Sequence, residues 1–244
     1  MKWFVLIGAF LVTFPGRGQE LMDKLFHNGN TYDVVKMEYT SAIPSNLSFI
    51  ENTELLSHDE FLGGLLLTDP AFFLVNACIS DAECKPMGLY VVDGRVLNGI
   101  NSDDGEGNFY LKPNGALLLM NNRVVICETA DISRHGQVIH GIQSGPMLVV
   151  DNRIHPGFTP NSANKHLRVG VGVSTNSQGQ EFLQFAISNE PVNFFDFADF
   201  FKNKLGCENA LVLESQGCSM YYEGRSSENM FYTGKICRYI MMKM

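Results

Sequence analysis

Basic residues are scarce in this sequence of 244 residues, which has 18 Lys and Arg against 26 Asp and Glu and a formal net charge of −8. Proteins that bind nucleic acid gather lysine and arginine on one surface, so this charge balance argues against a nucleic-acid partner. Repeats, low-complexity tracts and linkers rich in Pro or Ser are also missing, while hydrophobic residues make up 45% of the chain. Such a composition excludes intrinsic disorder and predicts a globular protein with a full core.

Familiar catalytic and metal-binding signatures are missing as well. The sequence has no Gly-x-Ser-x-Gly elbow, no His-Glu-x-x-His, no phosphate loop and no dinucleotide fingerprint. No Cys-x-x-Cys occurs, and the six histidines are scattered, with His135 and His140 at a spacing that does not place both on one helix face. We therefore expect neither a metal site nor a cofactor.

The N-terminus carries a short apolar run. Lys2 precedes twelve mostly apolar residues, Trp3–Phe14, and Gly16 and Gly18 follow as small residues before Gln19. This layout predicts a signal peptide over residues 1–18 and one mature domain over residues 19–244. Twelve residues are too few for a spanning helix, which needs about 20, so we expect no membrane span and a secreted or periplasmic bacterial protein.

All six cysteines lie in the predicted mature part, at positions 78, 84, 127, 207, 218 and 237. A secreted protein meets an oxidising compartment in which disulfides form. Six cysteines allow fifteen full pairings, and the sequence does not choose among them. Cys78 and Cys84 are close enough in the chain to close a small loop.

Short apolar runs punctuated by Gly, Asn and Asp predict strands joined by tight turns. Two helices stand out: one begins at the capping box of Ser57–Glu60, and the other covers Phe194–Leu205 with Asn193 as its N-cap. The predicted strands lie at 32–39, 72–77, 88–92, 95–97, 108–112, 116–120, 123–128, 147–150, 153–155, 168–174, 181–188 and 210–213. Strands with few helices indicate an α+β class, a mixed and mostly antiparallel sheet with a few packed helices in a single domain.

Polar residues stand where several apolar strands begin or end. They are Asn76, the segment 143–145 (Gln-Ser-Gly), Arg168 and Glu214. Strand ends are rigid and the adjoining loops are accessible, so this location suits a functional site. Each residue also has a structural explanation as a turn cap, a bend or a solvated edge residue.

Six blocks in a fixed order resemble a known family. The blocks are Leu74–Val91, Gly107–Gly115, Gln143–Val149, Arg168–Val173, Phe185–Gly206 and Leu211–Tyr221. They resemble the Asn-Ala-Gly-Met-Phe and Pro-x-Gly-Leu-Tyr segments, the Arg-x-Gly-Val-Gly-Val strand and the Leu-Asp-Gly motif of the phosphodiester glycosidases. The resemblance covers about residues 30–225.

This resemblance implies hydrolysis of the bond between a sugar C1 and a phosphodiester, with a carbohydrate or sugar-phosphate as the small-molecule partner. It implies catalytic roles for Arg168, a guanidinium fork that matches two phosphate oxygens, and for Glu214, which stands at the Asp position as base or nucleophile. It implies substrate contacts from seven further residues: Asn76, Gln143, Ser144, Gly145, Ser188, Ser215 and Ser219.

The sequence departs from the family pattern within the site blocks more than within the scaffold blocks. Cys78 replaces a Gly, Ser80 a Phe, and Glu214-Ser215 an Asp-Gly pair. Cys218 replaces a Ser and Ser219 a basic residue. These departures leave three hypotheses open: an active glycosidase, a catalytically inactive glycan- or glycoconjugate-binding protein on the same scaffold, and a structural envelope protein without a ligand.

Overall fold

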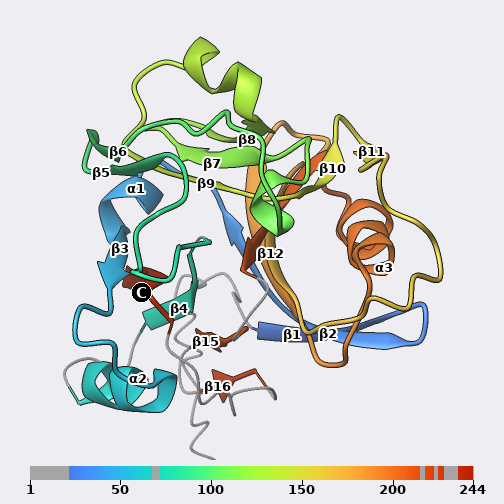
Figure 1. Ribbon diagram of the computed structural model, residues 1–244, viewed down its shortest axis with the longest axis horizontal. Coiled ribbons are helices and arrows are strands. Elements are labelled where there is room, and N and C mark those ends of the chain that lie inside the picture. The colour runs from blue at the N-terminus through green and yellow to red at the C-terminus, as the bar shows by residue number, and fades with distance from the viewer. Residues whose placement is uncertain are drawn as a thin grey trace, which may run out of the picture.

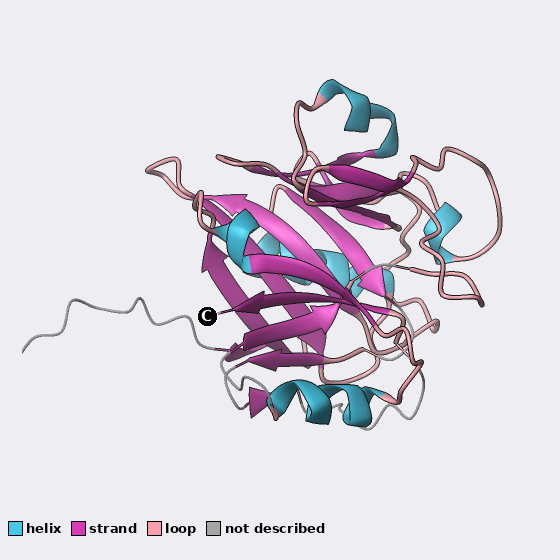
Figure 2. Cartoon of the chain, turned by 90° about the vertical axis from the view of Figure 1, so that its left-hand side faces the viewer, coloured by secondary structure: helices cyan, strands magenta, loops and turns pink. Residues whose placement is uncertain are grey.

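The computed structural model describes residues 22–67, 72–77, 79–214, 218–222, 225–227 and 236–243. Within these residues three antiparallel sheets pack around a shared apolar centre, and short helices cover their outer faces (Figures 1 and 2). The expected α+β class with mostly antiparallel strands is confirmed.

The first sheet has seven strands, and its order mixes segments from both ends of the chain. In spatial order they are β1 (Met22–His27), β2 (Asn30–Glu38), β13 (Glu181–Ser188), β12 (Val169–Thr175), β14 (Asn209–Glu214), β10 (Met147–Val150) and β11 (Arg153–Ile154). The strand β1 was not predicted, because its exposed, charged residues lack an apolar run.

The second and third sheets have five strands each. The second runs β16 (Arg225–Ser226), β15 (Met220–Tyr222), β4 (Phe72–Asn76), β17 (Arg238–Lys243) and β3 (Leu47–Glu51). The third runs β6 (Arg95–Asn98), β5 (Tyr90–Val92), β9 (His140–Ser144), β7 (Gly115–Leu119) and β8 (Val124–Glu128).

Three helical segments cover these sheets. Helix α2 (His58–Leu66) lies on the second sheet, and helix α3 (Phe194–Asp199), continued by a π-helical turn over Phe200–Lys204, lies on the first (Figure 1). The 3₁₀ segment η2 (Thr129–Arg134) lies on the third sheet. A short helix α1 (Ile43–Asn46) precedes β3, and a 3₁₀ turn η1 (Asn108–Tyr110) precedes β7.

Strand alternation sorts the apolar side chains into one central core and three outer ones. Val169 and Val171 of β12 face the centre, whereas the alternating Gly170 and Gly172 face the helical segment of α3 and its π-helical turn. A Cβ at Gly172 would lie 2.5 Å from the Cys207 sulfur, so glycine at this position lets the helical segment approach the sheet closely. Successive residues of a strand point to opposite faces, and this rule also decides where the polar residues go.

Both predicted helix starts are confirmed. The Ser57 side chain accepts from the Glu60 backbone while the Glu60 carboxylate accepts from the Ser57 backbone, a complete capping box. Asn193 accepts from the backbone N–H of Asp196 at 2.8 Å as the N-cap of α3. The tight turns at 93–94 and 151–152 are confirmed too, since all four residues have positive φ.

Two expectations were wrong. The predicted strand over 108–112 is instead the turn η1, because Gly107 reverses the chain at φ 91° and the Asn114 side chain bonds back to the Phe109 carbonyl at 2.8 Å. Cys84 does not close a small loop with Cys78: it forms a disulfide with Cys237, 153 residues further on. The position of Cys78 lies outside the described residues.

Candidate active site

The start of β12 and the ends of β14 and β9 lie side by side, and predicted site residues stand at each of them. Val169 at the start of β12 pairs with Glu214 at the end of β14, and Arg168 comes directly before Val169. Ser144, the last residue of β9, donates from Oγ to the Leu213 carbonyl at 3.1 Å. The structure therefore brings Ser144, Arg168 and the backbone of Glu214 together.

Glu214 and Ser215, which replace the Asp-Gly pair of the family, are only partly described. The backbone of Glu214 belongs to β14, whereas its side chain and all of Ser215 lie outside the described residues. The roles expected for Glu214 and Ser215 stay predictions.

Arg168 is a buried cation held by the main chain. Only 1% of its surface is exposed. Its Nε donates to the Val192 carbonyl at 2.8 Å, one Nη donates to the Asn164 carbonyl at 3.3 Å, and the guanidinium lies 3.5 Å from the centre of the Phe194 ring. The other nitrogen, Nη1, is buried without a hydrogen-bond partner. The guanidinium is therefore fixed in place with both N–H groups of Nη1 unused.

The burial of Arg168 lowers its pKa to about 10, and the Cys218 thiol acts in the opposite direction. This pKa still lies well above neutrality, so the group is charged at pH 7. Since a charge in a poorly solvated place interacts strongly with an incoming anion, Arg168 is a local positive exception in an acidic protein. The predicted fork is only partly available, because Nε and one Nη already bind carbonyl oxygens.

Ser188 supports the backbone of Arg168. Its hydroxyl accepts from the Arg168 backbone N–H at 2.9 Å, and its own backbone N–H donates to the Arg168 carbonyl at 2.9 Å. Ser188 is fully buried, and its hydroxyl helps to hold the backbone of Arg168 in place.

Gln143 uses its side-chain amide within the protein. The oxygen accepts from the backbone N–H groups of Leu89 and Asn101, and the nitrogen donates to the Asn101 carbonyl and the Thr129 hydroxyl. Such a buried amide joins the third sheet to the loop after β6.

Gly145 lies in the tight bend between β9 and β10, where its bond to Pro146 is cis. A Cβ at this position would lie 2.8 Å from both the Phe109 carbonyl oxygen and the Asn114 Cβ. The bend therefore requires glycine for close backbone approach.

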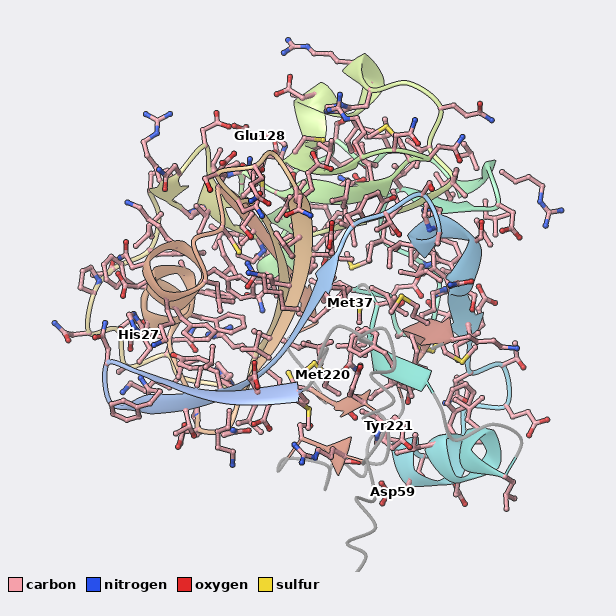
Figure 3. All side chains as sticks on the ribbon, turned by 180° about the vertical axis from the view of Figure 1, so that it is seen from behind. His27, Met37, Asp59, Glu128, Met220 and Tyr221 are labelled. Atoms are coloured by element: carbon pink, nitrogen blue, oxygen red, sulfur yellow. A yellow bond between two sulfur atoms is a disulfide. The ribbon has the colours of Figure 1, made fainter. Side chains whose placement is uncertain are left out.

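Asn76 and Ser219 lie on a different face from the central core. Val75 and Ala77 contribute to that core, as do Cys218 and Met220, so Asn76 and Ser219 between them point toward α2. The Asn76 Oδ1 accepts from the Ser219 backbone N–H at 2.7 Å. In Figure 3 the same alternation separates Met220 from Tyr221, which lies on the side of Asp59 and α2.

His58, at the start of α2, completes this second group. Its Nε2 lies 2.6 Å from the Ser219 Oγ, and its Nδ1 lies 3.0 Å from the Tyr239 hydroxyl. His58 and Tyr239 are fully buried. Burial lowers the pKa of His58 and raises the pKa of Tyr239, so both side chains are neutral at pH 7.

Four of the predicted site residues thus belong to two separate clusters: Arg168 and Ser188 to one, and Asn76 and Ser219 to the other. We call the first the arginine cluster: Asn164, Arg168, Ser188, Val192 and Phe194. We call the second the histidine cluster: His58, Asn76, Ser219 and Tyr239. Cys218, next to Ser219 and in electrostatic contact with Arg168, connects the two along the chain.

The sequence profile of the phosphodiester glycosidases matches residues 71–240. The chain belongs to this family. The match contains the arginine cluster and all of the histidine cluster except His58.

Other proteins and solved structures are similar to this chain as well. The Escherichia coli K12 protein YigE, itself uncharacterized, is 34% identical over 150 residues, which are 62% of this chain and 58% of YigE, less than two thirds of its length. The catalytic domain of zebrafish N-acetylglucosamine-1-phosphodiester alpha-N-acetylglucosaminidase superposes with a TM-score of 0.59 at 13% identity, over 92% of this chain and 82% of that domain. A hypothetical protein from Synechocystis gives 0.54 at 12% identity, over 91% and 61%. At such identities the superpositions show a shared fold.

This member of the family has no grouping of three His, Cys, Asp or Glu side chains suited to a metal ion among its described residues. Nor does the described part of the chain contain a helix long and apolar enough to cross a membrane.

Sequence reasoning missed His58 and Tyr239. His58 lies inside a capping box, where its neighbours explain the pattern, and residues 58, 219 and 239 are far apart in the chain. No local signal joins them, because α2 is brought to Ser219 only by its packing on the second sheet.

Proposed function

We propose that this chain is an exported hydrolase that cleaves the bond between the anomeric carbon of a sugar and a phosphodiester oxygen. The observation that carries the proposal is the buried, charged Arg168, which directly precedes β12 and whose Nη1 lacks a partner. A phosphodiester is an anion, and an N–H group of a fixed guanidinium is a strong donor to a phosphate oxygen.

The reaction requires charge to be placed on the leaving group. As the C1–O bond breaks, its electron pair goes to the phosphate oxygen, and water supplies the hydroxyl that C1 receives. Arg168 would stabilise the developing negative charge, a contribution that is large when the donor is already oriented. Glu214, whose backbone pairs with Val169 beside Arg168, is the candidate for base or nucleophile.

The family supports a sugar phosphodiester as the substrate class. The zebrafish relative is named for an N-acetylglucosamine-1-phosphodiester, which makes this compound class the first to test. The predicted signal peptide over residues 1–18 supports export to the periplasm or the medium, and mass spectrometry of the mature protein would test cleavage before Gln19.

A catalytically inactive glycan-binding protein is the second candidate. Two of the three nitrogens of Arg168 are used by backbone carbonyls, and Gln143 uses both ends of its amide internally. Fewer donors are therefore left for a substrate than the resemblance implies.

A hydrolysis screen over sugar-1-phosphodiesters separates the candidates. We expect turnover by the wild type, a loss of at least about 100-fold in Glu214→Gln, and a comparable loss in Arg168→Ala. Arg168→Lys, which keeps the charge, and thermal unfolding of each variant separate lost chemistry from lost folding. Arg95→Ala on the exposed strand β6 is the control. Sugar binding without any turnover would favour the second candidate.

A further inference from the structure

The loop between β11 and β12, residues 155–168, carries a chain of ring contacts that ends on Arg168. The ring centres of His155 and Phe158 lie 4.4 Å apart with planes 18° from parallel, and those of Phe158 and Phe194 lie 5.0 Å apart at 15°. The Arg168 guanidinium in turn lies 3.5 Å from the centre of the Phe194 ring. The loop passes beside α3 (Figure 1), and these contacts run without a gap from its first residue to its last.

His155 is the fixed end of this chain of rings. It is 2% exposed, and its backbone N–H donates to the Leu148 carbonyl in β10 at 3.0 Å. Its Nδ1 accepts from the Gly157 backbone N–H at 3.0 Å, which sets the angle of the ring. Phe158 therefore stacks on a ring that the main chain holds in place.

The loop is also joined to the segment that begins α3. His166 and Val192 exchange two backbone hydrogen bonds, of 3.1 and 2.9 Å, and the Asn193 side chain donates to the Ser162 carbonyl at 3.3 Å. The stacking of Phe158 on the ring that follows Asn193 is thus one of several links between the same two segments.

These two segments supply everything that holds the guanidinium. The segment before α3 provides the Val192 carbonyl for Nε and the Phe194 ring, and the loop provides the Asn164 carbonyl for one Nη. All N–H bonds of a guanidinium lie in one plane. Two bonds in that plane and a ring against its face fix the direction of the remaining Nη1, which has no partner.

We infer that Phe158 and Phe194 are positioning residues that aim Nη1 of Arg168 at an anionic oxygen of the ligand. Neither ring is assigned a contact with the ligand. The inference rests on the proposed function for the class of ligand, a sugar phosphate or phosphodiester.

The flat face of the rings is the property that matters. A ring attracts a cation through its negative face, most strongly where water is excluded, and Arg168 is only 1% exposed. A leucine of similar apolar character keeps some packing but offers no flat, negative face. A donor that is held in advance saves the entropy of ordering it on binding, and a misplacement of about 1 Å is enough to reduce a rate strongly.

The first measurement follows Arg168 itself and needs no ligand. Proton–nitrogen NMR detects its Nε–H, assigned as the signal that Arg168→Lys removes. Phe158 does not touch Arg168, so a shift of this signal in Phe158→Leu would report movement of the guanidinium rather than a lost neighbour. We expect such a shift in Phe158→Leu and a signal close to that of the wild type in Phe158→Tyr, which keeps the ring.

The second measurement is binding of N-acetylglucosamine-1-phosphate, with free N-acetylglucosamine as the second probe, by calorimetry. We expect Phe194→Leu to weaken binding of the sugar phosphate about 3- to 30-fold, the range of one cation–π contact. Phe158→Leu should weaken it by a smaller factor, and Phe158→Tyr should restore it. Binding of the free sugar should not change.

Phe182→Leu in β13 is the matched control. Phe182 is half-buried, as are Phe158 and Phe194, and its ring also carries a cation, the Lys36 Nζ at 4.3 Å from the centre. This variant should change neither the Arg168 signal nor the affinity. Thermal unfolding shows which variants are folded; if Phe194→Leu is not, the pair Phe158→Leu and Phe158→Tyr carries the test.

Each outcome has a defined meaning. An Arg168 signal or a sugar-phosphate affinity that Phe158→Leu leaves unchanged, or no binding of the sugar phosphate by the wild type, would overturn the inference. If binding depends on the two rings but no diester is hydrolysed, the proposed function fails and this inference stands. If diesters are hydrolysed and Phe158→Leu and Phe194→Leu remain fully active, the inference fails and the proposed function stands.

Discussion

Gln143 binds the main chain of Asn101 from both sides. Its Oε1 accepts from the Asn101 N–H at 2.9 Å, and its Nε2 donates to the Asn101 carbonyl at 2.7 Å. A side-chain amide thus stands in for a neighbouring strand at this point. The loop after β6 is held next to β9 by this pair, with Leu89 and Thr129 as the remaining partners.

Gln143→Glu should therefore be strongly destabilising. The new carboxylate would face the Asn101 carbonyl without a donor between them, and a buried charge without a partner costs several kcal/mol. We expect the free energy of unfolding in urea to fall by about 2–4 kcal/mol. The matched control is Gln178→Glu, in the exposed turn between β12 and β13; equal effects of the two changes would contradict the bonding of Gln143.

Gly145→Ala should disrupt the bend between β9 and β10. The added Cβ would lie 2.8 Å from the backbone oxygen of Phe109, which cannot move without shifting η1. Overpacking of this kind costs about 1–3 kcal/mol. Thermal unfolding measures the loss, and Gly136→Ala, with nothing within 4 Å of its added Cβ, should change stability little. A Gly145→Ala protein as stable as the wild type would show that the bend has more room than the structure indicates.

The stability of the protein should fall in mild acid. Burial lowers the pKa of His58 and of His155, so the unfolded chain binds protons at higher pH than the folded one. Stability is then complete above the unfolded histidine pKa of about 6.5 and declines as the pH falls below it. Urea unfolding from pH 7.5 to 5 tests this.

The variant His58→Gln identifies the contribution of one histidine. Each such histidine adds at most about 1.4 kcal/mol per pH unit to the slope of the free energy of unfolding against pH. The variant should lose the contribution of His58 to this slope. An unchanged slope would mean that His58 takes up its proton in the folded state as easily as in the unfolded one.

Reduction of the Cys84–Cys237 disulfide should destabilise the protein. This bond closes a loop across a sequence separation of 153 residues, and removal of a native disulfide typically costs about 2–5 kcal/mol. The double variant Cys84→Ser, Cys237→Ser should unfold at lower temperature and no longer respond to dithiothreitol. Cys127→Ser, which removes a free thiol, is the control. Retention of the dithiothreitol response by the double variant would show that another bond is involved.

The sequence predicted local features well. Capping residues such as Ser57 and Asn193, and turns such as Asp93-Gly94, depend on neighbours within a few positions, and the structure confirms them. The antiparallel α+β class also follows from short strands and tight turns. The strand expected over 108–112 failed because the bond from Asn114 to Phe109 competes with strand pairing.

The site was less predictable, because it depends on which face each strand presents. The family resemblance implies a role in one site for both Arg168 and Ser219. In the structure, Arg168 lies against Phe194 and Ser219 lies against His58. The register of two distant strands decides this, and a shift by one residue would exchange the faces.

The strands that precede residue 71 decide which fragment of the chain can fold when it is expressed alone. The family profile begins at residue 71, but β2 pairs along β13 and β3 pairs along β17. A recombinant fragment of residues 71–240 would leave both partners as bare sheet edges, which recruit other chains. The matched segment is the part of the sequence that the family profile describes, whereas folding on its own requires the N-terminal strands as well.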